Sequence, residues 1–326
     1  MTNDAKSRPG MPVLPRLGFG AAAIGQPSVP IAQAIDCVEA AWDSGMRYFD
    51  TAPMYGAGRS EILLGRALSG RPGGSYLLST KVGRLVRPDH AETVHTGADW
   101  IYDYSRDGVL TSLEESLRRL GIDHADIVFI HDPDHHWQQA LDDAWPTLAR
   151  LRDEGVVRAV GVGMTQAPML ARFIRETDID VVLGAGVYTL LDTQASLELL
   201  PEAARRGVTV IAAQAMHGGL IDGVANAQFR YRPVDGEIRT KVARIARICH
   251  EHGIPTAAAA IQFPLRHPAV TCVLTGHASR EQLDENIAWA AREVPPAVWA
   301  CLRSEGLLPL DLPVPSAAPP AIPSTP

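Results

Sequence analysis

The sequence lacks the features that mark secreted, membrane-spanning or metal-finger proteins. It has only four cysteines in 326 residues, and Cys37, Cys249, Cys272 and Cys301 form neither a CxxC pair nor a metal-finger spacing. No apolar run reaches the roughly 18 residues that predict a membrane span. The N-terminus shows no basic segment followed by an apolar signal core. These absences predict a cytoplasmic protein with reduced thiols.

Long runs of one charge are also absent. The chain has 30 Lys and Arg against 37 Asp and Glu, a formal net charge of -7 at pH 7. Nucleic acids and anionic membrane surfaces attract proteins with basic patches, so we expect neither as a partner. No motif indicates an oligomeric state.

The two ends of the chain differ in composition from its middle. We interpret residues 1–14 as a polar N-terminal extension and residues 308–326 as a tail rich in proline, alanine and serine. A tail of that composition cannot bury a core. Residues 15–307 are expected to form one domain, because α/β barrels of this length commonly have a single core.

Short β-rich runs alternate with amphipathic helical patterns through that domain. The candidate strands are residues 16–20, 47–51, 76–81, 126–132, 157–163, 180–186, 208–214 and 270–276. Apolar strands that are separated by helices require parallel pairing with right-handed crossovers. Eight such units predict a closed (β/α)8 barrel, the TIM-barrel fold.

Two of the helical patterns carry end signals, and one alternative fold competes with the barrel. Residues 31–45 end at Gly45, whereas residues 105–121 begin with Ser105 as an N-cap and end at Gly121. A doubly wound sheet would need a GxGxxG loop after its first strand. The glycines in GFGAAAIG do not have that spacing, so we favour the barrel.

Four titratable residues lie where predicted strands end. Asp50 ends the second strand, Lys81 ends the third, His131 nearly ends the fourth, and Tyr55 follows Asp50 in a loop. Barrel enzymes carry their reactive groups at this end of the strands. An ammonium group favours the phenolate form of a nearby tyrosine, and a carboxylate holds that ammonium in place. The set predicts proton transfer by Tyr55 coupled to hydride transfer at carbon, with His131 aligning the substrate oxygen.

These residues lie within longer motifs that resemble a known family. FDTAPMYG, GRSEILLGRAL, LSTKVGR, SLEESLRRLGIDHADIVFIH, VRAVGVG and TGHASREQLDENI together resemble the aldo-keto reductase superfamily over residues 14–292. The resemblance implies the same barrel, with a nicotinamide cofactor across its C-terminal rim. It also implies that Asp50, Tyr55, Lys81 and His131 form the catalytic tetrad.

Several cofactor positions of the family differ here. Gly163 and Met164 stand where many members carry Ser-Asn, Ala185 replaces a glutamine, and Ala213 replaces a tyrosine that stacks on the nicotinamide. We expect Gln214 or backbone atoms to hold the carboxamide instead. The cofactor-binding residues predicted at this end of the cofactor are Gly20, Ala21, Asp50, Gly163, Met164 and Gln214.

The adenosine end of the cofactor site also departs from the family pattern. Members that use NADP offer a lysine, a serine and an arginine to its 2'-phosphate, and the matching positions here are Gly276, His277 and Gln282. A phosphate is best held by an arginine fork or a lysine charge. We therefore expect NAD to be preferred, with NADP as a second cofactor because Arg280 lies close by. The residues predicted to bind here are Gly276, Ala278, Arg280, Gln282, Glu285 and Asn286.

The substrate class follows from a narrower resemblance. STKVGRLV, DYSRDGVLTSLEESLRRLG and IHDPD resemble the branch of the family that contains L-fucose, D-threo-aldose and L-galactose dehydrogenases and pyridoxal 4-dehydrogenase. We expect oxidation of the anomeric carbon of a free aldose to a lactone. The alternatives are oxidation of pyridoxal to 4-pyridoxolactone and a role as a nucleotide-binding accessory subunit. The predicted substrate-binding residues are Tyr55, His131, Asp132, Trp137 and His217.

The segment HDPDHHWQQ could also be interpreted as a metal site. It contains three histidines and two aspartates, but no strand or helix spacing places the histidines on one face. We interpret the segment as a strand end and a proline turn, with Asp134 as the N-cap of a helix that begins near His135. No metal is predicted.

Overall fold

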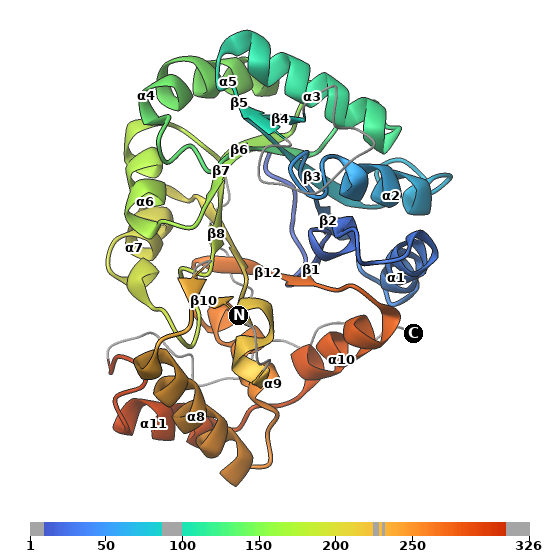
Figure 1. Cartoon of the computed structure of the whole chain (residues 1–326). Helices are drawn as coiled ribbons and strands as arrows, with labels where there is room; N and C mark the ends of the chain where they lie inside the picture. Colours follow the sequence, from blue (N-terminus) through green and yellow to red (C-terminus); the bar gives the residue numbers. More distant parts are fainter. Residues whose placement is uncertain (1–9, 87–99, 224–227, 230–231, 311–326) are drawn as a thin grey trace.

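Eight parallel strands close into a barrel surrounded by helices in the computed structural model, which describes residues 10–86, 100–223, 228–229 and 232–310 (Figure 1). The barrel order is β1-β12-β9-β8-β7-β6-β3-β2. The bounds are β1 Leu17–Gly20, β2 Tyr48–Asp50, β3 Leu77–Val82, β6 Ile127–His131, β7 Ala159–Met164, β8 Val181–Ala185, β9 Thr209–Ala213 and β12 Val270–Gly276. The predicted TIM barrel and its eight strands are confirmed.

The alternation of side chains along each strand builds two apolar layers. In β6, Ile127 and Phe129 point into the barrel, whereas Val128 and Ile130 pack in the layer between strands and helices. Successive side chains of a strand point to opposite faces, so apolar residues at every position are needed where both faces are covered. Met11 and Leu14 join the interior cluster. Part of the segment that we interpreted as an N-terminal extension therefore packs into the barrel.

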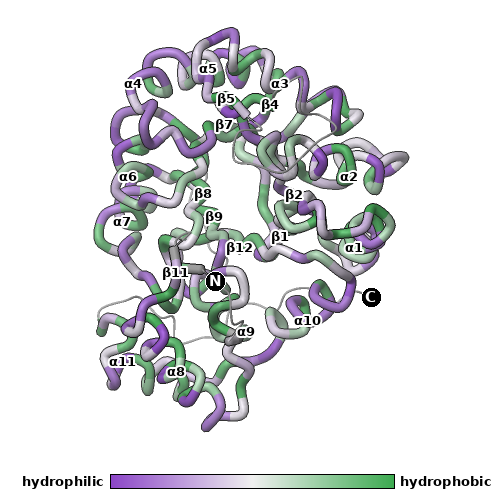
Figure 2. Tube along the Cα trace, in the orientation of Figure 1, coloured by the Kyte–Doolittle hydropathy of each residue, from purple (hydrophilic) through white to green (hydrophobic). Residues whose placement is uncertain are grey.

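The outer helices are amphipathic, and their polar sides appear purple along the rim of the molecule (Figure 2). Their bounds are α1 Ile31–Asp43, α2 Arg59–Leu68, α3 Arg106–Leu120, α4 Trp137–Gln139, α5 Trp145–Asp153, α6 Ala167–Glu176, α7 Leu199–Arg206, α8 Gly236–Glu251, α9 Thr256–Gln262, α10 Arg280–Ala291 and α11 Pro296–Ser304. Short 3-10 turns cover Ala23–Gly25, Gln194–Ser196, His217–Asp222 and Pro264–Arg266, and one π-type turn covers Ala140–Ala144. No helix in these described ranges is long and apolar enough to cross a bilayer.

The helix ends agree with the sequence signals in two places and differ in a third. The hydroxyl of Ser105 accepts the backbone N–H of Gly108 at 3.1 Å, and Gly121 ends α3 in a left-handed conformation. Gly45 is also left-handed just after α1. The prediction for Asp134 was wrong, because α4 begins later, at Trp137, and has no side-chain cap. Asp134 instead accepts a hydrogen bond from the Gln166 amide.

Two small hairpins that the sequence analysis did not predict are added to the barrel. The first pairs β4 Arg84–Val86 with β5 Trp100–Tyr102, and places Arg84 opposite Tyr102. The second pairs β10 Gln228–Phe229 with β11 Arg232–Pro233. Because β4 begins two residues after β3 ends, the first hairpin rises from the rim on which Lys81 lies.

Candidate active site

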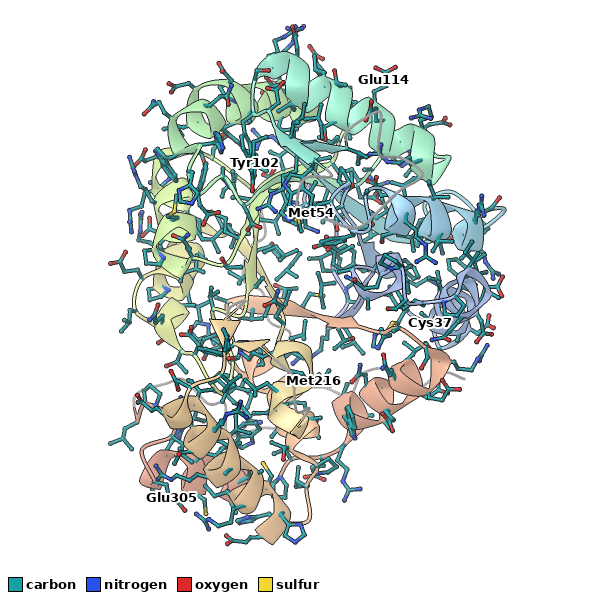
Figure 3. The ribbon with its side chains drawn as sticks, viewed as in Figure 1. Cys37, Met54, Tyr102, Glu114, Met216 and Glu305 are labelled. Atoms are coloured by element: carbon teal, nitrogen blue, oxygen red, sulfur yellow. The ribbon has the colours of Figure 1, made fainter. Side chains whose placement is uncertain are left out.

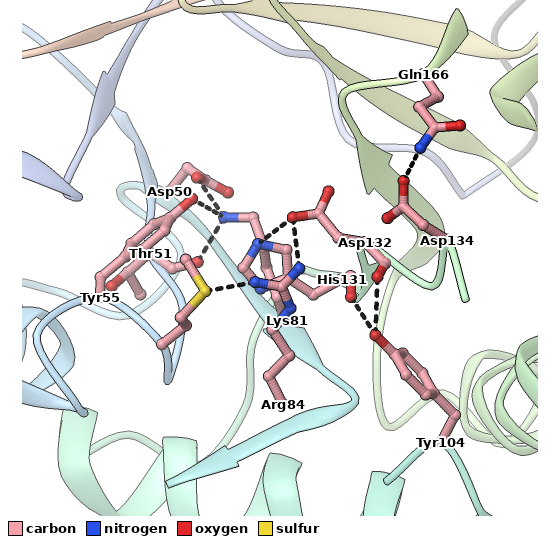
Figure 4. A network of polar contacts seen from close by, with 11 residues as sticks. Asp50, Thr51, Tyr55, Lys81, Arg84, Tyr104, His131, Asp132, Asp134 and Gln166 are labelled. Atoms are coloured by element: carbon pink, nitrogen blue, oxygen red, sulfur yellow. Dashed lines mark hydrogen bonds and ion pairs between the residues drawn. The ribbon is translucent and has the colours of Figure 1, made fainter. Parts of the chain in front are cut away.

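The predicted tetrad comes together at the C-terminal rim of the barrel (Figure 4). The Nζ atom of Lys81 lies 2.7 Å from Oδ2 of Asp50 and 3.0 Å from the hydroxyl of Tyr55. The ring of His131 stands edge-on to the ring of Tyr55, with 6.0 Å between ring centroids. Adjacent strands β2, β3 and β6 supply three of the four residues. The tetrad therefore follows directly from strand order.

Lys81 is buried and every one of its protons has an acceptor. Besides Asp50 and Tyr55, the ammonium donates to the carbonyl oxygen of Thr51 at 2.9 Å. An ammonium group has three N–H donors, so its hydrogen-bonding capacity is filled. Burial alone would lower the pKa of Lys81, but Asp50 and Tyr55 together raise it. Lys81 thus carries its charge while only 2% exposed.

A buried chain of hydroxyl groups orients Asp50. Ser79 donates to Oδ1 of Asp50 at 2.7 Å, and the hydroxyl of Tyr48 lies 3.0 Å from that of Ser79. The carbonyl oxygen of Asp50 accepts the backbone N–H of Ala21. Both carboxylate oxygens and the backbone of Asp50 are therefore fixed. Sequence reasoning missed Ser79, although it lies two residues before Lys81 and so points to the same face of β3.

Burial and the charge of Lys81 act on the Tyr55 hydroxyl in opposite directions. Burial raises the pKa of Tyr55 above its ordinary value; the Lys81 ammonium lowers it, but by less, and Asp50 raises it further. The Lys81 ammonium acts in the expected direction, but burial has the larger effect. The sequence does not reveal how completely the phenol is removed from water. Tyr55 is therefore a neutral phenol that can donate its proton.

His131 is a neutral ring with unused hydrogen-bonding capacity. Burial lowers its pKa well below the usual range, and the charges of Lys81 and Arg84 lower it further. Its Nδ1 atom is buried and has no hydrogen-bond partner among the described residues. Its Nε2 atom lies 3.7 Å from Oδ2 of Asp132, which is too far for a hydrogen bond. The ring can therefore bind an oxygen atom placed between it and Tyr55.

The loop that carries Tyr55 is fixed by residues of the GRSE motif. Arg59 donates to the carbonyl oxygens of Ile24 and Gln26, both at 2.8 Å, and of Val29 at 2.6 Å. Gly56 has a φ of +62°, and a side chain there would collide with the carbonyl oxygen of Gly25. The glycine after Tyr55 therefore lets two loops meet closely, and Arg59 ties the same two loops together.

Glu61 supports the site from beneath. Its carboxylate is fully buried and accepts a hydrogen bond from Thr80 and another from Arg119, each at 2.7 Å. Thr80 precedes Lys81 on β3. The motif residues that carried the family resemblance, Arg59 and Glu61, thus position the site without belonging to it.

An arginine that the sequence analysis did not identify lies beside His131. Arg84 donates to Oδ2 of Asp132 at 2.8 Å and contacts the sulfur of Met54 at 2.6 Å. Its guanidinium group is also 5.3 Å from the ring of Tyr102, which Figure 3 labels together with Met54. Asp132, a predicted substrate-binding residue, is therefore paired and close to the tetrad.

Two other predicted substrate-binding residues do not join the tetrad. The ring of Trp137 packs at a tilt against Phe173 of α6, with 4.3 Å between ring centroids, and Arg172 covers its ring at 4.1 Å. His217 is 4% exposed, and its Nε2 atom lies 2.9 Å from the hydroxyl of Thr189. Burial lowers the pKa of His217 to about 4. Both side chains pack against distant segments of the chain, and the loop sequence alone does not predict such contacts.

The barrel edge between β1 and β12 presents bare backbone. Gly20 pairs directly with Gly276, and a side chain at Gly276 would meet only the carbonyl oxygen of Gly20, at 3.8 Å. Ala21 is completely buried beside this edge. Two adjacent glycines let a flat ligand approach the backbone closely. This edge fits the predicted course of a dinucleotide.

The positions expected to hold the nicotinamide carboxamide lie at the ends of β7 and β9. A side chain at Gly163 would lie 3.8 Å from Cε of Lys81, so this glycine faces the barrel interior beside the tetrad. Met164 is 1% exposed and lies in the layer between strands and helices. Gln214 is exposed and has a φ of +57° just after β9. Gly163 thus lies beside the tetrad and Gln214 lies at the exposed end of β9, whereas Met164 offers a ligand no polar side-chain atom.

At the predicted adenosine end, a buried polar chain replaces part of the expected surface. His277 is fully buried, and its ring nitrogens lie 3.0 Å from the Thr275 hydroxyl and 2.9 Å from the Asn286 amide. Burial lowers the pKa of His277 to about 4. Its position was aligned with a phosphate contact, but the ring points inward. The Oδ1 atom of Asn286 is buried without a partner among the described residues, so it is an acceptor that a ligand could satisfy.

The remaining residues of this region surround the start of α10. The side chain of Gln282 accepts the backbone N–H of Ala278 at 2.8 Å. Arg280 forms a two-point ion pair with Asp36 of α1, at 3.0 and 3.2 Å. Glu285 is exposed. The glycine edge and the unsatisfied Asn286 oxygen fit a bound nicotinamide dinucleotide. Arg280, which lies nearby, is already paired with Asp36.

The histidines and aspartates after β6 are not arranged as a metal site. Asp132 pairs with Arg84, and the His136 ring stacks on Tyr102 with 5.0 Å between centroids. Within the described part of the chain, no cluster of three or more histidine, cysteine or acidic side chains could hold a metal ion.

Comparison with known proteins identifies relatives over nearly the whole chain. The Aldo/keto reductase family model matches residues 16–304. A D-threo-aldose 1-dehydrogenase of a Pseudomonas species is 38% identical over 325 residues, covering 94% of this chain and 98% of that protein. A pyridoxal 4-dehydrogenase of Microbacterium luteolum is 36% identical and covers 90% and 94% of the two chains.

Solved structures show the same fold. A glycerol dehydrogenase of Gluconobacter oxydans superposes with a TM-score of 0.74 at 24% identity, over 97% of this chain and 100% of that one. A holo-form aldo-keto reductase of Bacillus halodurans gives a TM-score of 0.72 at 21% identity, over 94% of each chain. The chain is therefore an oxidoreductase of the aldo/keto reductase family, whose members use nicotinamide cofactors.

Proposed function

We propose that this protein oxidises the anomeric carbon of a free aldose to a lactone, with NAD as the hydride acceptor. The observation that carries the proposal is the Lys81 network, in which one buried ammonium joins Asp50 to the hydroxyl of Tyr55. The 38% identity to a D-threo-aldose 1-dehydrogenase supports an aldose such as L-fucose as substrate. The complete tetrad argues against an accessory subunit without activity.

The tetrad residues would divide the proton chemistry as follows. The substrate hydroxyl lies between the Tyr55 oxygen and the His131 ring, and Tyr55 takes its proton as the carbon–oxygen double bond forms. NAD, when bound, accepts the hydride that leaves the same carbon. Lys81 stabilises the phenolate before the transfer, and neutral His131 donates a hydrogen bond that aligns the substrate oxygen. The phenolate must exist for oxidation, so oxidation should become faster as the pH rises.

Oxidation of pyridoxal is the second candidate, because a specific feature favours it. The ring of His136 stacks on Tyr102 near the rim, and Tyr102 in turn lies beside Arg84. Such an aromatic group can hold a flat heterocycle. The 36% identity to a pyridoxal 4-dehydrogenase supports the same reading. Both candidates use the same tetrad and differ only in what covers the substrate ring.

The pairing of Arg280 supports a preference for NAD over NADP. A 2'-phosphate needs an arginine fork or a lysine charge, and the Nε–Nη2 edge of Arg280 already binds the Asp36 carboxylate. Asp36 also places a negative charge beside Arg280. The inward-facing His277 ring and the capping role of Gln282 remove two further candidates.

A substrate panel tests the proposed reaction. Purified protein is mixed with NAD and, in turn, L-fucose, D-arabinose, L-galactose, L-xylose, D-glucose or pyridoxal, and NADH formation is followed by absorbance. We expect oxidation of the threo-configured sugars. Activity on pyridoxal alone would replace the first proposal by the second, and activity on none of them would contradict both.

Removal of the Tyr55 hydroxyl tests the proton-transfer role. We expect Tyr55→Phe to lower kcat by about 10² to 10⁴, the range typical of acid-base catalysis, while NAD still binds when titrated by fluorescence quenching. Tyr76→Phe is the matched control, since Tyr76 packs against Trp42 and Phe49 outside the site. Near-normal turnover by Tyr55→Phe would rule out the assigned role.

The cofactor preference can be tested by releasing Arg280. We expect wild type to use NAD more efficiently than NADP, and Asp36→Asn to shift the ratio of kcat/KM values toward NADP by about tenfold, roughly one charge-assisted hydrogen bond. Glu39→Gln removes the same charge from an exposed position of the same helix, and should leave the ratio unchanged. A wild-type preference for NADP would show that Arg280 or a neighbouring group binds the phosphate despite the pairing, and an unchanged ratio in Asp36→Asn would show that the pairing does not decide the preference.

A further inference from the structure

A paired arginine and aspartate, Arg84 and Asp132, lie beside the tetrad and are not needed for its proton chemistry. The Arg84 guanidinium and the Asp132 carboxylate are 2.8 Å apart, with side chains 11% and 19% exposed. The carboxylate oxygen of this pair is also 3.7 Å from Nε2 of His131. Figure 4 shows the Asp132 carboxylate on the side of His131 that faces away from Asp50, joined by a dashed line to Arg84. The pair therefore borders the position that the reacting oxygen would occupy, and solvent still reaches it.

The backbone at Asp132 explains why two consecutive side chains point to one site. Neighbouring side chains of a regular strand point to opposite faces, but Asp132 has a φ of +41° just after β6 ends. The hydroxyl of Tyr104 fixes this turn by donating to the carbonyl oxygens of His131 at 2.6 Å and Asp132 at 3.0 Å. The backbone N–H of Asp132 donates to Gly163. A strained conformation that its surroundings hold in place is common at ligand sites.

The guanidinium group is held rigidly on its other sides. Met54 contacts one of its nitrogens, and the rings of Tyr102 and Trp100 lie 5.3 Å and 6.0 Å away. Its Nε atom is buried and has no partner within the described residues. Burial raises the pKa of Asp132 to about 6, although Arg84 lowers it. The pair thus combines fixed N–H donors with a carboxylate whose burial is only partly offset by the charge of Arg84.

Such a pair suits a hydroxyl group better than an anion or a hydrocarbon. A hydroxyl can donate to the carboxylate oxygen while it accepts from the guanidinium. Hydroxyl oxygens on neighbouring carbons lie about one hydrogen-bond length apart. With the reacting oxygen against Tyr55 and His131, the hydroxyl on the adjacent carbon reaches the carboxylate oxygen that lies 3.7 Å from Nε2.

We propose that the Arg84–Asp132 pair recognises the hydroxyl on the carbon next to the reacting one, so that the site takes 2-hydroxy aldehydes and their cyclic forms. The inference deepens the proposed function and rests on it for the position of the reacting oxygen. It makes Arg84 and Asp132 specificity-determining residues, and assigns the proton chemistry to neither.

Two small aldehydes that differ by this single hydroxyl provide the test. Reduction of lactaldehyde and of propionaldehyde is measured with NADH, and the ratio of the two kcat/KM values is taken for each preparation. Wild type should favour lactaldehyde by about tenfold or more, the effect of a hydrogen bond to charged groups. Arg84→Gln and Asp132→Asn should both bring the ratio close to one. Because both substrates are measured on one preparation, partial misfolding of a variant cancels from the ratio.

Arg158→Gln is the matched control. Arg158 pairs with Asp126 at 3.1 Å at the opposite end of the same strand, β6, so the variant also breaks an arginine–aspartate pair. Its ratio should equal that of wild type. Equal efficiencies for the two aldehydes in wild type would overturn the inference, as would variants that lose activity on both without a change in ratio.

The comparison of the two aldehydes and the sugar panel test different proposals. A strong preference for lactaldehyde that disappears in both variants supports the inference even where the sugar panel is silent, which would contradict the aldose proposal alone. Oxidation of sugars without any preference for lactaldehyde would leave the proposed function intact and overturn the role of the pair.

Discussion

The active site depends on one buried ammonium group. Lys81 donates to the Asp50 carboxylate, the Thr51 carbonyl and the Tyr55 hydroxyl, all within 3.0 Å. A buried charge is costly unless it is paired and fully hydrogen-bonded, so the surrounding structure must keep these three acceptors in place. Ser79 and Tyr48 orient the carboxylate, Arg59 holds the loops beside Tyr55, and Glu61 braces β3 through Thr80. The motif residues outside the tetrad serve this one arrangement.

Two arginine–aspartate pairs border the site and have different consequences. Arg280 is bound by Asp36 on the outside of the barrel, where the pairing removes a cation from the predicted adenosine end. Arg84 is bound by Asp132 near the mouth, where both partners remain reachable. The first pair would restrict the cofactor and the second the substrate. Both are local charge arrangements added to a fold that this family shares.

The strands and the tetrad could be predicted because they follow from local patterns. Apolar runs gave the eight strands, and the position of Asp50, Lys81 and His131 at strand ends placed them on one rim. Packing between distant segments could not be predicted in the same way. Trp137 packs against Phe173, His277 turns inward to Asn286, and burial raises the pKa of Tyr55. The left-handed backbone of Asp132 has no signal in the sequence, so its pairing with Arg84 could not be predicted.

The central claim is that the Lys81 ammonium lowers the proton affinity of Tyr55, and the pH dependence of sugar oxidation tests it most directly. Lys81 lowers the pKa of Tyr55, whereas burial and Asp50 raise it, so removing the ammonium must raise it further. We expect kcat/KM to rise with pH in wild type, and the rise to move upward by about 1 to 3 pH units in Lys81→Met. A variant with a lower plateau but an unchanged pH profile would contradict the claim, and would reduce Lys81 to a residue that only positions Tyr55.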